Sequence, residues 1–162
     1  MLNAEKLLMQ YNRDGVFKLE IETEEQNGIC YRFAYDSYMT SVDEYSRRNQ
    51  FNERKIIQDI YNGKRAEYMV YNVLKKHNRN VSEPDVKIYE ANRKSYDADL
   101  KCDIVDLHVK SHVINNRFKT SWVFQKNDPL VVSPTDKDWI CLCVLNNTKN
   151  YMYLVRSDKV TY

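Results

Sequence analysis

The stretch from Tyr96 to His112, YDADLKCDIVDLHVKSH, decides the fold because it reads as two short strands joined by a turn over Asp103, Ile104 and Val105. Successive side chains of a strand face opposite ways, so each strand has one mostly apolar face and one ionisable face. The ionisable residues at alternate positions are Asp97, Asp99 and Lys101 on the first strand and Asp106, His108, Lys110 and His112 on the second. The hairpin therefore brings carboxylates, histidine and lysine onto neighbouring strands.

The chain has 162 residues, which suits one domain with a sizeable core. We expect a single domain over residues 1–162, with a core over 52–162 and an N-terminal elaboration over 1–51. Charged residues make up 30% of the chain and hydrophobic residues 43%, and the sequence has neither a bilayer-length apolar run nor a signal with an apolar centre. A soluble, intracellular (cytoplasmic) protein without a membrane segment is the expectation.

Charge and cysteine usage limit the classes of function. The formal net charge is only +2, from 25 Lys and Arg against 23 Asp and Glu, so any basic surface must be local. The four cysteines have no C-x-x-C spacing, and a chain of this size needs no covalent staples. Reduced thiols in the core are therefore expected rather than disulfides or a zinc site.

The region before residue 52 predicts a β-hairpin. Ala4–Tyr11 favours a short helix, and Val16–Thr23 alternates apolar and charged residues, which is typical of a half-buried strand. A turn at Gln26–Gly28 and a second strand over Ile29–Tyr35 would complete the hairpin. The polar, tyrosine-rich segment Ser37–Phe51 carries no clear pattern.

A long helical pattern starts at Asn52, with Gly63 as a possible kink. Glu67 lies at the edge of its second apolar stripe, so a partly buried carboxylate is expected. The ordinary alternatives are a Glu paired with Lys64 or a solvated flank residue.

The remaining strands are expected on both sides of the opening hairpin. They cover Val86–Glu90, Leu130–Val132, Trp139–Leu145 and Tyr151–Val155. The near-continuous apolar run Trp139–Leu145 predicts a central strand that is covered on both faces.

Several common chemistries lack their motifs. The sequence has no G-x-S-x-G elbow and no Walker or dinucleotide glycine pattern. His108 and His112 are four positions apart, which on a strand separates them by roughly 13 Å, too far to share one zinc ion. Cys141 and Cys143 share one face of a buried strand, where core packing explains them.

The combination of Glu67 on a helix, Asp99 in DADL and His108-Val109-Lys110 in LHVKS resembles the restriction-endonuclease-like superfamily of nucleases. The signature of that family is an Asp on one strand followed by a (D/E)-x-K tripeptide on the next. The resemblance covers roughly residues 64–155, and its motif is short and degenerate. It implies an α/β fold with a mixed central sheet flanked by helices, to which the N-terminal β-hairpin would be an elaboration.

The resemblance also implies metal-dependent endonuclease chemistry on DNA. Mg²⁺ takes oxygen ligands and retains waters, so one or two carboxylates hold it against a phosphate. Asp99 is the expected main ligand and Glu67 the second, while Lys110 orients water or stabilises charge on the phosphate. Asp85, which follows Pro84, is a less favoured candidate than Asp99 because it begins an earlier expected strand.

His108 departs from the family pattern, which has an acidic residue there. Three interpretations stay open: His108 ligates a softer ion such as Mn²⁺, or it acts as a base or hydrogen-bond partner, or the site has lost activity. Asp106 and Asp103 offer compensating carboxylates, although Asp103 is more simply a turn residue.

Binding residues follow from the same resemblance. Basic residues around such a centre would contact phosphates, and Gln125, with Trp122 and Phe124, would approach bases unless these aromatic rings belong to the core. The expected nucleic-acid-binding residues are Lys64, Arg65, Arg117, Lys119, Gln125 and Lys126.

Three functions are therefore weighed. The first is a metal-dependent endonuclease on DNA, with RNA as another possible substrate and a homodimer as the arrangement suggested by symmetry. The second is a catalytically inactive nucleic-acid-binding module on the same fold. The third is a non-enzymatic interaction protein.

Overall fold

The computed structural model describes residues 16–77, 79–89, 97–115, 117, 119–147 and 149–160. The predicted helix Ala4–Tyr11 lies outside these residues. The elements along the chain are β1 (Phe17–Leu19), α2 (Glu24–Arg47), α3 (Glu53–Lys76), β2 (Leu100–Cys102), β3 (Val105–Val113), α4 (Pro129–Val132), β4 (Asp138–Leu145), β5 (Asn150–Arg156) and a 3₁₀ turn (Ser157–Lys159).

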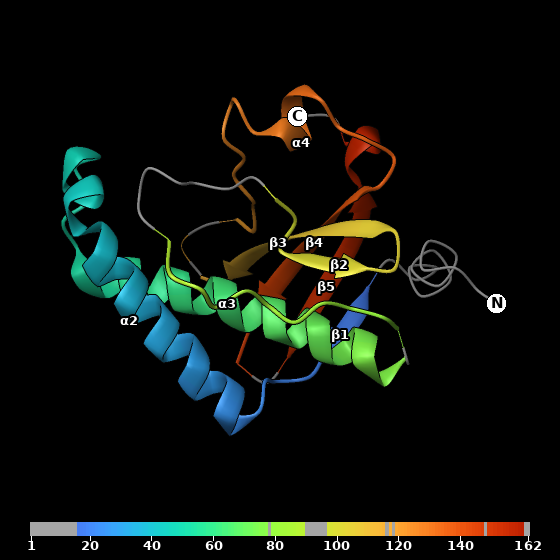
Figure 1. Ribbon diagram of the computed structural model, residues 1–162, viewed down its shortest axis with the longest axis horizontal. Coiled ribbons are helices and arrows are strands. Elements are labelled where there is room, and N and C mark those ends of the chain that lie inside the picture. The colour runs from blue at the N-terminus through green and yellow to red at the C-terminus, as the bar shows by residue number, and fades with distance from the viewer. Residues whose placement is uncertain are drawn as a thin grey trace.

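The strands form one mixed five-stranded sheet in the order β1-β5-β4-β3-β2. β3 and β4 are parallel, and the other neighbouring pairs are antiparallel. Figure 1 shows α3 lying across the sheet with α2 beside it, and α3 contacts β1, β2, β3 and β4. The chain is thus a mixed α/β protein with a mixed sheet, as predicted.

The core lies between the sheet and α3. Strand alternation directs Leu107, Cys141, Cys143 and Met152 toward the helix, where they meet a set of apolar side chains of α3. Each large aliphatic side chain buried in this way contributes about 1.5–3 kcal/mol. The set on α3 is Ala66, Met69, Val70, Val73 and Leu74. All four cysteines are buried and free, which confirms the prediction of reduced core thiols.

The predicted N-terminal β-hairpin is wrong. Within residues 16–51, only Phe17–Leu19 is a strand, and it pairs with β5 in the main sheet. The segment Ile29–Tyr35 lies inside α2 because Thr23 and Gln26 form a reciprocal capping box that starts a helix. Gly28, predicted in a turn, is therefore a helical residue.

The buried stripe of α2 holds this helix in place. Its buried residues are Cys30, Ala34 and Tyr38, which recur every four residues. The segment 37–51, which carried no clear pattern, continues the helix to Arg47 and then turns into α3.

Two further strand predictions fail downstream. Leu130–Val132 belongs to the short helix α4, which Asp128 caps and Pro129 begins. In the predicted strand Val86–Glu90, residues 86–89 have no strand structure and Glu90 lies outside the described residues. Val81 makes an isolated bridge to Cys102.

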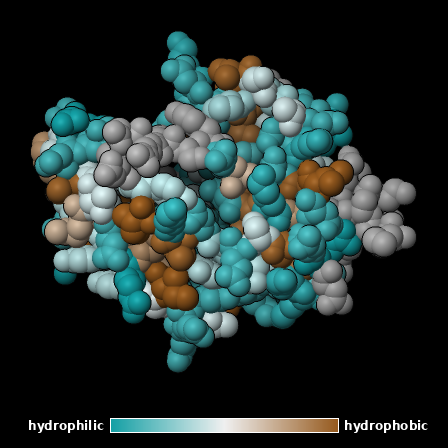
Figure 2. All heavy atoms as spheres, viewed as in Figure 1, coloured by the Kyte–Doolittle hydropathy of each residue, from teal (hydrophilic) through white to brown (hydrophobic). Residues whose placement is uncertain are grey.

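The helix that starts at Asn52 and the strands Trp139–Leu145 and Tyr151–Val155 are confirmed. The hairpin is confirmed in part, because its first strand covers only Leu100–Cys102, so that Asp97 and Asp99 precede it, and Val105, predicted in the turn, begins β3. α3 runs unbroken through Gly63, and β4 is central and buried on both faces, as Ile140 and Cys141 show. Among the helices of the described residues, none is both long enough and apolar enough to cross a membrane. On the face drawn in Figure 2, apolar side chains form separate patches among polar ones.

Candidate functional site

Asp99 lies at the edge of the sheet, immediately before β2. The strands β2 and β3 pair only from Leu100 opposite Leu107 to Cys102 opposite Val105. Past this short ladder, the Asp99 carboxylate accepts a hydrogen bond from the backbone N–H of Val109, with 2.7 Å between Oδ2 and N. The side chain thus takes the place of a strand partner on the edge of β3.

The environment of Asp99 combines burial with positive charge. Burial raises the pKa of Asp99 above its ordinary value. Four groups lower this pKa without cancelling the effect of burial. They are the Val109 N–H and the side chains of His108, Lys64 and Lys110. Asp99 therefore interacts electrostatically with residues from both α3 and β3.

Glu67 reaches the same region from α3. Its side chain is only 12% exposed, and its Oε2 atom accepts a hydrogen bond of 2.7 Å from Lys64 Nζ. Burial raises the pKa of Glu67 to about 8; Lys64 opposes the shift, whereas Asp99 and Asp85 add to it. The prediction of a partly buried Glu67 is confirmed, and so is the alternative that it pairs with Lys64.

Lys64 is held by three kinds of contact. Besides Glu67, its ammonium donates to the backbone carbonyl of Asp85 over 2.6 Å and lies 4.4 Å from the centre of the Phe33 ring. Its side chain is 9% exposed. Lys64 is therefore an internal counterion to Glu67 rather than a cation on an open surface.

His108 and Lys110 lie on the other face of β3. The register pairs His108 with Ile140 and Lys110 with Leu142, whereas the intervening Val109 packs toward the core under α3. Because strand side chains alternate, His108 and Lys110 project away from the helix that carries Glu67.

The partners of His108 come from the start of β4. The His108 Nε2–H donates to Asp138 Oδ1 over 3.0 Å, and Asp138 also accepts from the Thr135 hydroxyl over 2.7 Å. Burial acts to raise the pKa of Asp138, but the hydrogen bonds from Thr135 and His108 outweigh it and lower that pKa. Asp138 thus fixes the imidazole ring, as a carboxylate does for many catalytic histidines.

Lys110 faces the connection between β3 and β4. Its ammonium lies 3.9 Å from Asp128 Oδ2 and 5.3 Å from the centre of the Phe124 ring. Phe124 is therefore tied to Lys110, and the neighbouring Trp122 donates to the Cys143 carbonyl over 3.4 Å.

The four predicted site residues thus form two groups that meet at Asp99. Glu67 and Asp99 are brought together with Lys64, while His108 and Lys110 act on Asp99 from the opposite face of β3. Sequence reasoning missed Asp138 and Asp128 as the partners of His108 and Lys110. The one available signal for Asp138 was its position directly before the most apolar strand of the chain.

The predicted phosphate-binding residues divide in the same way. Arg65 forms a buried ion pair with Glu22, so, like Lys64, it is committed to an internal partner. The others are exposed on the connection from β3 to β4, where the backbone carbonyl of Gln125 accepts from Asp128 N–H. These exposed residues are Arg117, Lys119, Gln125 and Lys126.

The donor set limits the metal that this region could hold. Among the described residues, no three His, Cys, Asp or Glu side chains are grouped so that they could hold a metal ion. Glu67 and Asp99 do provide two carboxylates within electrostatic reach of one another, which suits a hard cation that keeps most of its waters. The Nε2 atom of His108 is already engaged with Asp138, so the set does not fit an ion that needs imidazole as a third ligand.

No protein family, curated protein or solved structure matches this chain.

Proposed function

We propose that the chain is a metal-dependent endonuclease that hydrolyses phosphodiester bonds in DNA. One observation carries the proposal: the carboxylates of Glu67 and Asp99 are both poorly solvated, and the negative charge of Asp99 adds to burial in raising the pKa of Glu67. Two carboxylates in that condition favour a divalent cation, because its charge would offset both burial and their repulsion.

Each residue of the candidate site has a role in this proposal. Glu67 and Asp99 would hold the cation, and Mg²⁺ or Mn²⁺ would supply Lewis acidity toward the phosphate and lower the pKa of a water. Lys110 supports the ionised form of Asp99 and would contribute positive charge toward the phosphate. The Val109 N–H orients the Asp99 carboxylate.

His108 fits the role of base or hydrogen-bond partner better than that of metal ligand. Asp138 accepts from Nε2, which fixes the tautomer that carries its proton on this nitrogen and leaves Nδ1 as the acceptor atom of the ring. Exposed Arg117, Lys119 and Lys126 would contact the phosphate backbone.

A second function is favoured by one observation. The ammonium of Lys64 already donates a hydrogen bond to the Glu67 carboxyl group, so Glu67 has a partner without any metal ion. A catalytically inactive nucleic-acid-binding module on this fold would need no metal ion beside Glu67.

Cleavage assays separate these functions. Purified protein would be incubated with duplex, single-stranded and branched DNA, and with RNA, in Mg²⁺, Mn²⁺ or chelator. The endonuclease proposal expects metal-dependent products from the wild type and their loss in Asp99→Asn and Lys110→Ala, with nucleic-acid binding retained. The matched controls are Asp97→Asn, two residues before Asp99, and Lys101→Ala, an exposed lysine on β2.

The remaining outcomes are equally informative. Salt-sensitive binding without cutting in any metal would reject the endonuclease and favour the inactive module. Absence of salt-sensitive binding would reject both and favour a non-enzymatic interaction protein.

A further inference from the structure

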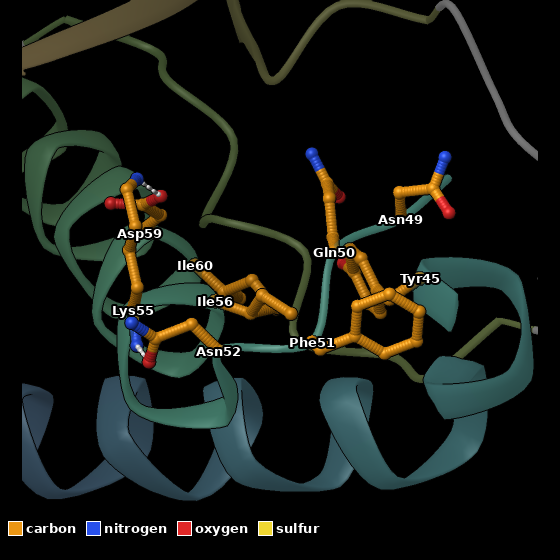
Figure 3. A pocket seen from close by; sticks show the side chains of 9 residues that line it. All are labelled: Tyr45, Asn49, Gln50, Phe51, Asn52, Lys55, Ile56, Asp59 and Ile60. Carbon is orange, nitrogen blue, oxygen red and sulfur yellow. Dashed lines mark hydrogen bonds and ion pairs between the residues drawn. The ribbon is translucent and has the colours of Figure 1, made fainter. Parts of the chain in front are cut away.

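A hollow of about 350 Å³ lies at the elbow between α2 and α3, beside the first turns of α3. Figure 3 shows the aliphatic side chains of Ile56 and Ile60 in its centre and the rings of Tyr45 and Phe51 along one side. Phe51 is 69% exposed, although a phenyl ring in water is unfavourable. An exposed ring beside an apolar hollow offers a stacking surface to a ligand.

The Tyr45 ring of the aromatic wall is held in place by its own helix. Ser41 departs from helical geometry, with φ −117° and ψ 17°, and so kinks α2 ahead of its last turns. The Tyr45 ring then stacks on the buried Tyr38 ring, with centroids 5.9 Å apart and an interplanar angle of 27°. A rigid ring binds with less loss of entropy than a mobile one.

The turn that follows α2 is also well ordered by hydrogen bonds. The backbone N–H of Gln50 donates to the Tyr45 carbonyl over 2.9 Å, and that of Asn49 donates to Ser46. Asn49 has a φ of 56°, a left-handed conformation that Asn tolerates better than most residues. The amide side chains of Asn49 and Gln50 therefore extend from a fixed backbone.

The polar groups of the hollow select a neutral ligand with hydrogen-bonding edges. In Figure 3 the amides of Gln50 and Asn49 extend from the turn at the rim of the hollow and are directed away from Ile56 and Ile60. On the other side of the hollow, Lys55 Nζ contacts Asp59 Oδ2 over 2.6 Å. The ion pair cancels its own charge, so the hollow does not favour an anion. The amides of Asn49 and Gln50 are exposed at the rim, where they are available to the polar edge of a ligand.

We propose that this elbow pocket binds a nucleobase, stacked on Phe51 and Tyr45 and hydrogen-bonded along its edge by the amides of Asn49 and Gln50. Aromatic stacking combined with amide recognition is the ordinary way in which proteins hold an unstacked base. The base comes from a single-stranded nucleic acid or from a free nucleoside, and both have the same planar heterocycle. The inference does not depend on catalysis at Glu67.

The position of the pocket relates it to the sheet-edge carboxylates. Ile60 precedes Glu67 by seven residues on α3, a rise of about 10 Å along the helix axis. That separation is about three base steps of a stacked strand. One strand could therefore place a base in the pocket and a phosphate near Asp99.

Amide NMR of the full chain, in buffer that contains chelator, tests the proposal directly. The probes are adenosine, guanosine, cytidine and thymidine, with ribose 5-phosphate as a probe that lacks a base. The expected result is saturable shifts of the Asn49, Gln50 and Phe51 signals with at least one nucleoside and none with ribose 5-phosphate. No saturable shift up to about 10 mM nucleoside, or equal shifts with ribose 5-phosphate, would overturn it.

Variants then test the stacking surface. Phe51→Ala should weaken nucleoside binding by about 5- to 150-fold, the range of stacking on one ring, whereas Phe51→Tyr should retain it. The control is Tyr31→Ala, which removes an exposed aromatic ring that belongs to α2 and lies outside the pocket. Wild-type affinity in a folded Phe51→Ala protein would overturn the assignment.

Two further measurements identify the source of the base and separate base binding from catalysis. Tighter binding of a short single-stranded oligonucleotide than of its nucleoside supports a nucleic acid, and equal affinity supports a free nucleoside. If a nucleic acid binds, an oligonucleotide that lacks the base bound in the pocket should bind no more tightly than the nucleoside. Asp99→Asn should leave all these shifts unchanged, so a failed cleavage assay and a failed pocket are distinguishable.

Discussion

Replacement of Glu67 by Gln tests the central electrostatic claim about the sheet edge. The carboxylate of Glu67 is buried beside Asp99, and its pKa is raised to about 8 from an ordinary value of 4.5. Gln keeps the size of the side chain and can accept the hydrogen bond from Lys64, but it carries no charge. The variant therefore removes the titration of Glu67 and little of the packing.

The sign follows from the direction of the shift. A carboxylate whose pKa is higher in the folded state than in the unfolded state stabilises the fold fully below its unfolded pKa. That contribution is lost as the pH rises through the folded pKa. For Glu67 the window runs from 4.5 to about 8. At 1.36 kcal/mol per pH unit, the ceiling of the effect is roughly 5 kcal/mol.

The assay is urea denaturation of wild type and Glu67→Gln at half-unit steps from pH 4 to 9, without divalent ions. The free energy of unfolding of Glu67→Gln minus that of wild type should rise across this window by a few kcal/mol, and the variant should be the more stable protein at pH 8. Glu53→Gln, which removes an exposed carboxylate from the first turn of the same helix, controls for helix charge.

A different result would refute the reasoning. If attraction to Lys64 exceeded the cost of burial, Gln would leave a buried ammonium without its counterion. The variant would then be less stable than wild type at neutral pH, by about 3–5 kcal/mol, with no rise across the window.

Three further outcomes are expected. Mg²⁺ at a hundredfold excess over its Kd should raise the Tm by about 5–10 °C in differential scanning fluorimetry, and Asp99→Asn should abolish this rise. Thr23→Ala should lower the stability by about 1 kcal/mol, measured by urea denaturation, because it removes the capping box of α2. Asp138→Asn should cost about 1–3 kcal/mol above pH 3.8, and the loss should disappear as the pH falls below that value, because the pKa of Asp138 is lowered.

The parts of the fold that sequence predicted share one property: the spacing of their apolar residues is set by which faces are buried. β3 alternates because one face meets α3, β4 is apolar throughout because both its faces are covered, and α3 shows a helical stripe because it lies on the sheet. The turn residue Asp103 also behaves as expected, with a φ of 54°. In each case local spacing and tertiary burial agree.

The failures have a local cause and a tertiary one. Alternation over Val16–Thr23 ended early because the capping box at Thr23 and Gln26 starts a helix, and Gly28 is tolerated within it. α4 replaced a strand because Asp128 and Pro129 favour a helix start over an extended segment. The capping box of α2 and the Asp128–Pro129 start of α4 are both clear helix signals, but each stands next to a strand pattern of similar strength.

The candidate site shows what local patterns cannot decide. Alternation predicts that His108 and Lys110 share a face, and they do, but it does not say which face α3 covers. Because α3 covers the face of Leu107, Glu67 approaches from the side opposite to His108. The resemblance to a nuclease motif concerned the order of residues along the chain, whereas the division into two groups depends on packing.

Asp99 resolves this division because it lies where β2 has separated from β3. A carboxylate within the ladder would face only one side of the sheet, but beyond the last pair at Leu100 it lies against the open edge of β3. From there it is influenced by Lys64 from α3 and by Lys110 from β3 at once. Extending β2 by one residue pair would bury this edge and separate the two groups. The short length of β2 is thus the feature of the fold on which the proposed chemistry depends.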